Sequence, residues 1–275
     1  MAVPEPEQTG PQGDGVREAV PEPGSRSEDG AGAGELPGGR ARPKTGKSEQ
    51  TRALILDTAM RLFQERGYDR TTMRAIAQEA GVSVGIAYYY FESKDVLIQG
   101  FYDRITREHA RDAAERMEGV RDFAARLEIA LASWLDCAGR YHAFGTQFFR
   151  TAADPDSPVS PFSEQSRPAR ATAVALFADV LAGSDLARKL DPELAAQLPE
   201  LLWLLLMAVV LHWVLDRTPD TTRTRELVRR STPLAARLIS MSRYRLLRPL
   251  VHDVTTLCRD FLLPAAATRT ATRGA

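Results

Sequence analysis

Two glycines, Gly67 and Gly81, divide residues 48–97 into short helical segments, and this division constrains the fold more than any other feature of the sequence. Apolar residues recur at helical spacing before Gly67, which predicts a first helix. A second helix is expected from Thr72 to Gly81, because glycine readily takes the left-handed conformation in which helices end. Ser83 is a good N-cap for a third short helix. The pattern therefore predicts three short helices with a tight turn at Gly81.

The rest of the sequence also predicts helices. Ser93 is expected to cap a long helix that runs toward Met117. Residues 154–161 are expected to form a loop, because three prolines in this segment are incompatible with a helix. No segment alternates in the way that is typical of a strand, so the fold class is all-α. Further helices are expected at residues 120–138, 140–152, 165–182, 192–216, 221–243 and 249–262.

The N-terminal segment differs from the rest in composition. Residues 1–43 hold seven prolines, nine glycines and no aromatic residue, so residues 1–47 are expected to be disordered. The same segment has four arginines and eight acidic residues, whereas the whole chain has no net charge. The remainder is therefore mildly basic, and the neutral total does not exclude a nucleic-acid partner. The expected domains are 48–97 and 98–263, with a loose tail at 264–275.

The second and third helices are interpreted as a helix-turn-helix, in which the second helix of the motif enters the DNA major groove. Arg74 is expected to contact guanine, while Thr72 and Lys94 contact phosphates. The exposed face of the third helix has no charge, so it would contact thymine methyl groups and use tyrosine hydroxyls. A packing unit without a DNA role explains the apolar positions equally well. The residues expected on that face are Ser83, Val84, Gly85, Ile86, Tyr88 and Tyr89.

Residues 71–94, TTMRAIAQEAGVSVGIAYYYFESK, closely resemble the DNA-binding domain of the TetR family of bacterial regulators, and residues 55–63 resemble that family's first helix. The resemblance covers about residues 49–97. Two positions depart from the family pattern: residue 84, often polar or basic, is valine, and residue 87, often leucine, is alanine. The resemblance implies DNA contacts by Thr72, Met73, Arg74, Val84, Gly85, Ile86, Tyr88, Tyr89 and Lys94.

The resemblance also implies that the C-terminal part forms homodimers and binds a small molecule. Residues 201–215 are apolar on every face. A helix of this length spans roughly 22 Å, less than the roughly 30 Å of a hydrocarbon layer, so we expect a buried helix and no membrane partner. The homodimer is expected to form through helices 192–216 and 221–243. Several arginines near residue 225 are interpreted as a solvated face paired with acids, in preference to a DNA patch.

Aromatic residues gather in the middle of the C-terminal part and predict an apolar ligand pocket. Ordinary core packing explains each of them individually as well. His142 and His212 are candidates for orienting a polar ligand group, with a core or surface role as the alternative. The predicted pocket residues are Trp134, Tyr141, His142, Phe144, Phe148, Trp203 and Met207.

The sequence shows no catalytic motif, no metal-ligand spacing and no cofactor motif, so an enzyme is not expected. Cys137 and Cys258 are interpreted as structural thiols in a reducing cytoplasm. No secretory signal is recognised at the N-terminus, in agreement with a cytoplasmic location. The favoured hypothesis is a repressor that a small-molecule ligand releases from a palindromic double-stranded DNA operator. The alternatives are a ligand-sensing or protein-interaction module of the same fold without operator binding, and a transcriptional activator.

Overall fold

The computed structural model describes residues 45–154, 156–241, 253 and 256–257. Within these residues the secondary structure is helical and contains no strand, which confirms the all-α prediction. The expectations for the tail before Thr45, for most of the helix 249–262 and for the tail 264–275 lie outside the described residues.

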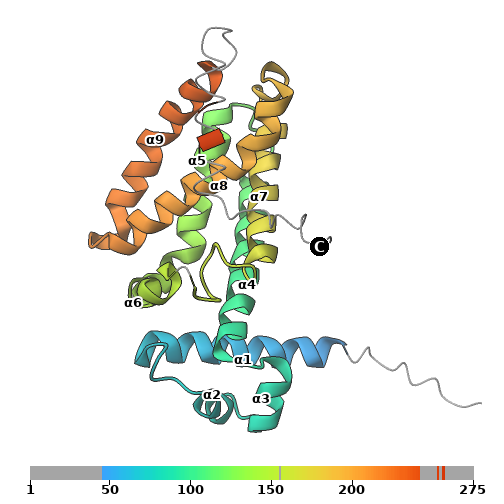
Figure 1. The fold of residues 1–275 in the computed structure, drawn as a ribbon, viewed down its shortest axis with the longest axis vertical. Coiled ribbons are helices and arrows are strands. Elements are labelled where there is room, and N and C mark those ends of the chain that lie inside the picture. The colour runs from blue at the N-terminus through green and yellow to red at the C-terminus, as the bar shows by residue number, and fades with distance from the viewer. Residues whose placement is uncertain (1–44, 155, 242–252, 254–255, 258–275) are drawn as a thin grey trace, which may run out of the picture. The chain divides into compact units, whose positions relative to one another are not determined.

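The N-terminal helices follow the predicted pattern (Figure 1): α1 (Thr45–Arg66), α2 (Met73–Glu79) and α3 (Val84–Tyr90). Helix α1 begins at Thr45, before residue 48, where the N-terminal domain was expected to start. Gly67 and Gly81 have φ angles of +84° and +67°, so both occupy the left-handed region that the predicted helix ends require. The side chain of Thr72 accepts a hydrogen bond from Ala75 N at 3.2 Å and so caps α2.

The remaining described helices are α4 (Lys94–Arg116), α5 (Phe123–Ala138), α6 (His142–Ala153), α7 (Arg167–Ala182), α8 (Pro192–Leu215) and α9 (Thr222–Met241). Each lies close to its predicted range. Helix α5 begins after the expected residue 120, because the Asp122 side chain accepts a hydrogen bond from Ala125 N at 2.8 Å and caps the helix at this point. The proline-rich loop between α6 and α7 is also confirmed.

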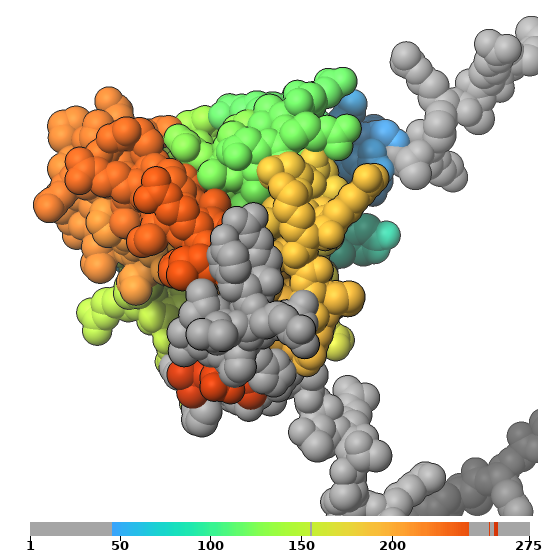
Figure 2. Space-filling model, turned by 90° about the horizontal axis from the view of Figure 1, so that it is seen from above, coloured from blue at the N-terminus to red at the C-terminus, as the bar shows by residue number. Residues whose placement is uncertain are grey.

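Helices α4, α5, α7 and α8 pack together around a continuous apolar core. Helix α9 packs against α5 and α8, and Figure 2 shows its orange surface beside this part of the molecule. Arg126 of α5 is buried and donates hydrogen bonds to the carbonyl oxygens of Met117, Val120, Asp179 and Val180. One guanidinium therefore joins the C-terminal ends of α4 and α7 to α5.

Helix α8 is long and apolar enough to cross a membrane when only length and composition are considered. This property is weak evidence, because core helices of globular proteins share it. Trp203, Leu206 and Trp213 are buried, and α8 packs against α6, α7 and α9. These contacts agree with the prediction of a core helix. Other apolar residues of α8 stay exposed, among them Leu211 and Leu215.

Candidate DNA interface and ligand cavity

Helix α3 presents an exposed, uncharged face. Ser83 caps the helix by accepting a hydrogen bond from Ile86 N at 3.2 Å. Ala87 is fully buried and seats α3 on the core beneath it, whereas Tyr89 is 82% exposed. The predicted outward residues Ser83, Val84, Gly85, Ile86, Tyr88 and Tyr89 are all exposed.

Helix α2 divides its predicted DNA-contact residues between the surface and the core. Thr72 and Arg74 are exposed, and Arg74 has no ion-pair or hydrogen-bond partner among the described residues. Met73 is only 6% exposed and belongs to the apolar core. The Met73 side chain therefore faces the core and not the predicted DNA-contact surface, because the first turn of α2 points it inward.

Lys94, the predicted phosphate contact, is held in place by Tyr68. Its Nζ donates a hydrogen bond to Tyr68 O at 2.8 Å and lies 4.3 Å from the centre of the Tyr68 ring. The Tyr68 hydroxyl donates to the carboxylate of Asp95. The start of α4 is thereby fixed to the segment between α1 and α2, and Lys94 is half-buried.

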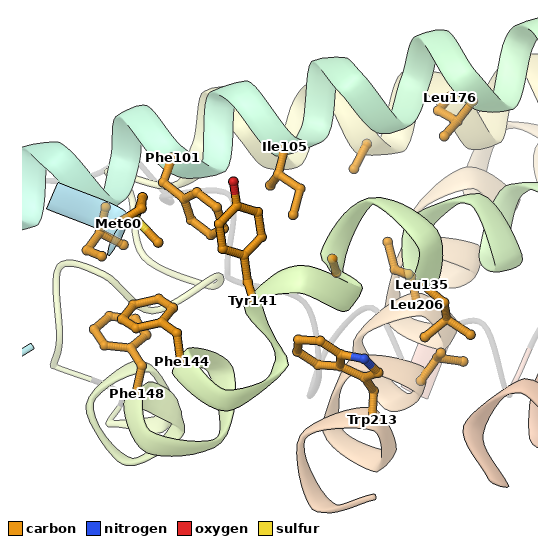
Figure 3. Close-up of a cluster of buried hydrophobic side chains, with 14 of the residues drawn as sticks. Met60, Phe101, Ile105, Leu135, Tyr141, Phe144, Phe148, Leu176, Leu206 and Trp213 are labelled. Carbon is orange, nitrogen blue, oxygen red and sulfur yellow. The ribbon is translucent and has the colours of Figure 1, made fainter. Parts of the chain in front are cut away.

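A cavity of about 560 Å³ lies among α4, α5, α6, α7 and α8, within the size range of small-molecule sites. Its walls are mostly apolar and aromatic. Figure 3 shows Phe144 and Phe148 adjacent on α6, with Tyr141 beside Phe101 of α4. Gly145 allows the Trp213 ring to pack closely against α6, because a Cβ atom at residue 145 would lie 2.8 Å from Cζ3 of Trp213.

The cavity brings together six of the predicted pocket residues: Trp134, Tyr141, Phe144, Phe148, Trp203 and Met207. His142 does not line it. The His142 ring packs against Trp213, and its Nε2 is 2.7 Å from the Trp213 backbone oxygen. This contact ties α6 to α8, so the structure places His142 at the contact between these helices and not at the cavity wall.

Two further lining residues, His109 and Arg170, are polar and were not predicted. His109 is almost fully buried, and its Nε2 is 2.7 Å from Ala130 O. Burial lowers the pKa of His109, so the imidazole is neutral at neutral pH. His109 follows Phe101 and Ile105 at four-residue spacing on the buried stripe of α4, and this position was the available signal. No sequence signal distinguishes Arg170 from other surface arginines.

Aromatic contacts connect the cavity wall to the N-terminal helices. Phe144 lies 5.9 Å from the ring centre of Phe63 in α1. Phe148 lies 5.1 Å from the ring centre of Tyr68, the residue that holds Lys94. Sequence reasoning did not identify Tyr68, because its role depends on α6 and α4 meeting it in space.

The corner between α8 and α9 is organised by buried Asp216. Its carboxylate accepts hydrogen bonds from the backbone N and the hydroxyl of both Thr218 and Thr224. Burial alone would raise the pKa of Asp216, but these four bonds outweigh burial and hold it well below its usual range. His212 also joins this corner, with Nδ1 2.8 Å from Thr224 Oγ1, and it does not line the cavity.

Of the four arginines near residue 225, three pair with acids as predicted, and Arg223 forms no ion pair within the described part of the chain. Arg225 lies 2.8 Å from Asp136, and Arg229 lies 2.7 Å from Glu226. Arg230 also contacts Glu226. These arginines thus form a charged, solvated face on α9. Cys137, the thiol that lies in the described part of the chain, is free and half-buried.

Two family models match the chain. The model described as "Bacterial regulatory proteins, tetR family" matches residues 55–100, and the model described as "Tetracyclin repressor-like, C-terminal domain" matches residues 126–257. The first match covers α2 and α3, and the second covers most of the cavity-lining helices.

Curated relatives resemble the N-terminal part. The HTH-type transcriptional regulator TtgR of Pseudomonas putida is 38% identical over 87 residues, which cover 31% of this chain and 41% of TtgR. The HTH-type transcriptional regulator BetI of Burkholderia ambifaria is 33% identical over 95 residues, 34% of this chain and 49% of BetI. The chain thus spans about half the length of the curated relatives it matches.

Solved structures share the fold over more of the chain. A putative TetR-family regulator from Syntrophomonas wolfei has a TM-score of 0.57 at 15% identity and covers 68% of this chain and 95% of its own. The fatty acid degradation regulator FadR from Bacillus halodurans has a TM-score of 0.53 at 19% identity, with coverages of 66% and 94%. These structures share the fold, and the two family models show that the chain belongs to the TetR family of bacterial transcriptional regulators.

Proposed function

We propose that the protein is a homodimeric repressor that binds a palindromic DNA operator and is released from it by a small-molecule ligand. The observation that carries the proposal is the exposed face of α3. Only Ala87 of this helix is buried, and four large apolar or aromatic side chains are exposed to solvent. An exposed apolar surface of this kind is typical of a binding site. The DNA major groove accommodates such a helix.

The contacts proposed for this interface divide between bases and backbone. Val84 and Ile86 would meet thymine methyl groups, and Tyr89 would reach base edges or phosphates. Arg74 is exposed and without a partner in the described part of the chain, so its guanidinium is available for guanine. Thr72 at the start of α2 and Lys94 at the start of α4 would position the backbone.

Dimerisation is proposed through the apolar surfaces of α8 and α9. One face of α9 packs against α5 through Val228, Thr224 and Thr232, which are buried. The other face exposes leucines at helical spacing, with Leu234 and Leu238 58% and 57% exposed. The family's domain architecture supports a second copy of the chain as the partner that covers this face. The two α3 helices of the dimer would then reach major grooves roughly 34 Å apart. The exposed apolar residues are Leu211, Leu215, Leu227, Leu234, Leu238 and Met241.

Ligand response is proposed to act through α6. Phe144 and Phe148 line the cavity on one side and contact Phe63 and Tyr68 on the other. A ligand that moves α6 would shift Tyr68, and with it Lys94. The ligand must bind the non-operator conformation more tightly, because otherwise it changes no population. FadR from Bacillus halodurans, which is named a fatty acid degradation regulator, is an example of the same fold in metabolic regulation.

A gel-shift assay with the DNA that flanks the protein's own gene tests this proposal. We expect a complex at physiological ionic strength that weakens as salt is raised and that unrelated DNA does not displace at equal concentration. A Tyr89→Ala variant should lose the specific complex and keep its fold. The absence of a salt-sensitive complex would refute the repressor.

The uncharged face of α3 also favours one rival, a ligand-sensing module that does not bind an operator. Such a module would give no specific gel shift and would still bind a small molecule in its cavity. A transcriptional activator would shift the same DNA, and a transcription assay with and without the protein separates it from a repressor.

A further inference from the structure

The mostly apolar cavity contains one permanent cation, Arg170, and none of its described lining residues is an aspartate or glutamate. From this asymmetry we propose that the ligand is an amphipathic organic acid whose carboxylate binds Arg170 and whose apolar body fills the cavity. The inference rests on the proposed ligand-responsive function and specifies the chemical class of the ligand.

Part of the Arg170 guanidinium has unused hydrogen-bond donors. Its Nη1 donates to Pro161 O at 2.8 Å and Ser163 O at 3.2 Å, which anchors the guanidinium beside the loop that precedes α7. Its Nε and Nη2 have no hydrogen-bond partner among the residues described. A guanidinium binds a carboxylate best with two parallel N–H donors, and Nε with Nη2 supplies such a pair.

Arg170 also forms no ion pair with any carboxylate among the described residues. Glu164 and Glu200 act on it electrostatically, but neither forms an ion pair with it in the described structure. Burial lowers the pKa of Arg170, because the charged form loses hydration beside Trp203. A partly desolvated cation without a counter-ion gains most from an anionic partner. Arg167, one turn earlier on α7, contrasts with it: this arginine is exposed and lies 3.6 Å from Glu164.

His109 limits the rest of the ligand. Because its Nε2 must donate to Ala130 O, a neutral ring leaves Nδ1 as an acceptor, and Nδ1 has no partner among the described residues. The neutral ring therefore adds no second positive charge. The anionic end of the ligand would bind Arg170, and the rest of the ligand must be uncharged. A hydroxyl or another hydrogen-bond donor is tolerated beside His109.

The experiment titrates the full-length protein with decanoate, 1-decanol and decylamine and records tryptophan emission. All three tryptophans of the chain line the cavity, so occupancy should change the signal. We expect decanoate to bind about tenfold or more tightly than decanol, and decylamine to bind most weakly, because a charged hydrogen-bonded pair has this order of effect.

Variants assign the preference to Arg170. Arg170→Met should weaken decanoate about tenfold, to the level of decanol, while decanol binding changes less than about twofold. Arg170→Lys should keep a preference for decanoate, and the matched control Arg167→Met should behave as wild type. Equal loss of decanoate and decanol in Arg170→Met would overturn the inference, since it would mean that Arg170 only holds the loop.

Two other results would also overturn the inference: decanoate no tighter than decanol in the wild type, or no response to any of the three compounds. None of these measurements contains DNA. A failure here therefore leaves the gel-shift result standing, and a failed gel shift leaves the preference for decanoate standing.

Discussion

Local caps shape α2 and α3, whereas the helices of the cavity domain are joined mainly by polar contacts between distant segments. In α2 and α3 the caps act over three residues, as when Thr72 binds Ala75 N and Ser83 binds Ile86 N. In the cavity domain the polar contacts join distant segments, such as Arg126 with Val180 O. The local caps set where α2 and α3 begin. The long-range contacts tie the helices of the cavity domain to one another, so a movement of one of these helices would act on its neighbours.

The largest expected effect on operator binding comes from disrupting the proposed dimer interface on α9. The double variant Leu234→Glu and Leu238→Glu should give monomers, because it places charges in the proposed α9 interface. Operator affinity should fall about 100-fold or more, since a monomer loses two-site binding. Analytical ultracentrifugation and gel shift measure the two outcomes. Ala178→Glu, on the exposed side of α7, is the matched control and should remain dimeric; a dimeric double variant would contradict the proposed interface.

Arg126→Met tests the long-range contacts of the cavity domain. It removes four hydrogen bonds that a buried guanidinium donates to backbone carbonyl oxygens, so the unfolding free energy should fall by about 3 kcal/mol or more. Urea denaturation measures the loss. Arg121→Met, at an exposed position nearby, should change stability by less than about 0.5 kcal/mol. Similar values for both variants would show that the buried arginine is not a structural link.

Asp216→Asn should lower the unfolding free energy at neutral pH by about 2 kcal/mol, because the α8–α9 corner loses charge-assisted hydrogen bonds. The folded pKa of Asp216 lies below its unfolded value of about 3.9, so its stabilising effect is complete above that value and declines as pH falls below it. The difference between wild type and variant should thus be constant above about pH 5 and shrink below about pH 4. Urea denaturation across this range checks the prediction, which a difference that grows on acidification would contradict.

Arg74→Ala examines the opposite region and should affect only function. Specific operator binding should weaken by about 1–3 kcal/mol, while thermal stability stays within about 0.5 kcal/mol of wild type, because Arg74 has no partner among the described residues. Fluorescence anisotropy with labelled duplex measures the affinity. Glu79→Ala, which removes an exposed ion pair with Arg61, is a control for surface charge on the same helix. Unchanged affinity would remove Arg74 from the interface.

The same contrast explains how far the sequence predicts the molecule. Caps and glycines act within a few residues, so α2, α3 and the outward face of Tyr89 follow from local pattern. The aromatic residues of α6 were predicted to line a pocket because aromatic residues gather in that part of the sequence. The burial of the Met73 side chain was not predicted, because the resemblance identifies a helix that approaches DNA without stating which way each side chain points.

The other placements that the sequence did not predict depend on contacts between distant segments. His142 binds a backbone oxygen 71 residues away, and no local pattern indicates this. Arg170 lies in an ordinary charged helix, and only the fold brings it to the cavity beside Trp203. Tyr68 gains its role from Phe148 and Lys94, which come from two different helices. These placements depend on tertiary packing, which single-sequence periodicity does not encode.

The central claim is that occupancy of the cavity changes operator affinity, and fluorescence anisotropy of a labelled duplex from the DNA flanking the protein's own gene tests it directly. The protein is titrated onto the duplex with and without decanoate at a concentration that saturates the tryptophan signal. We predict that operator affinity falls about tenfold or more and that the operator weakens decanoate binding by the same factor, as linkage requires. Unchanged operator affinity at full occupancy of the cavity would contradict the account.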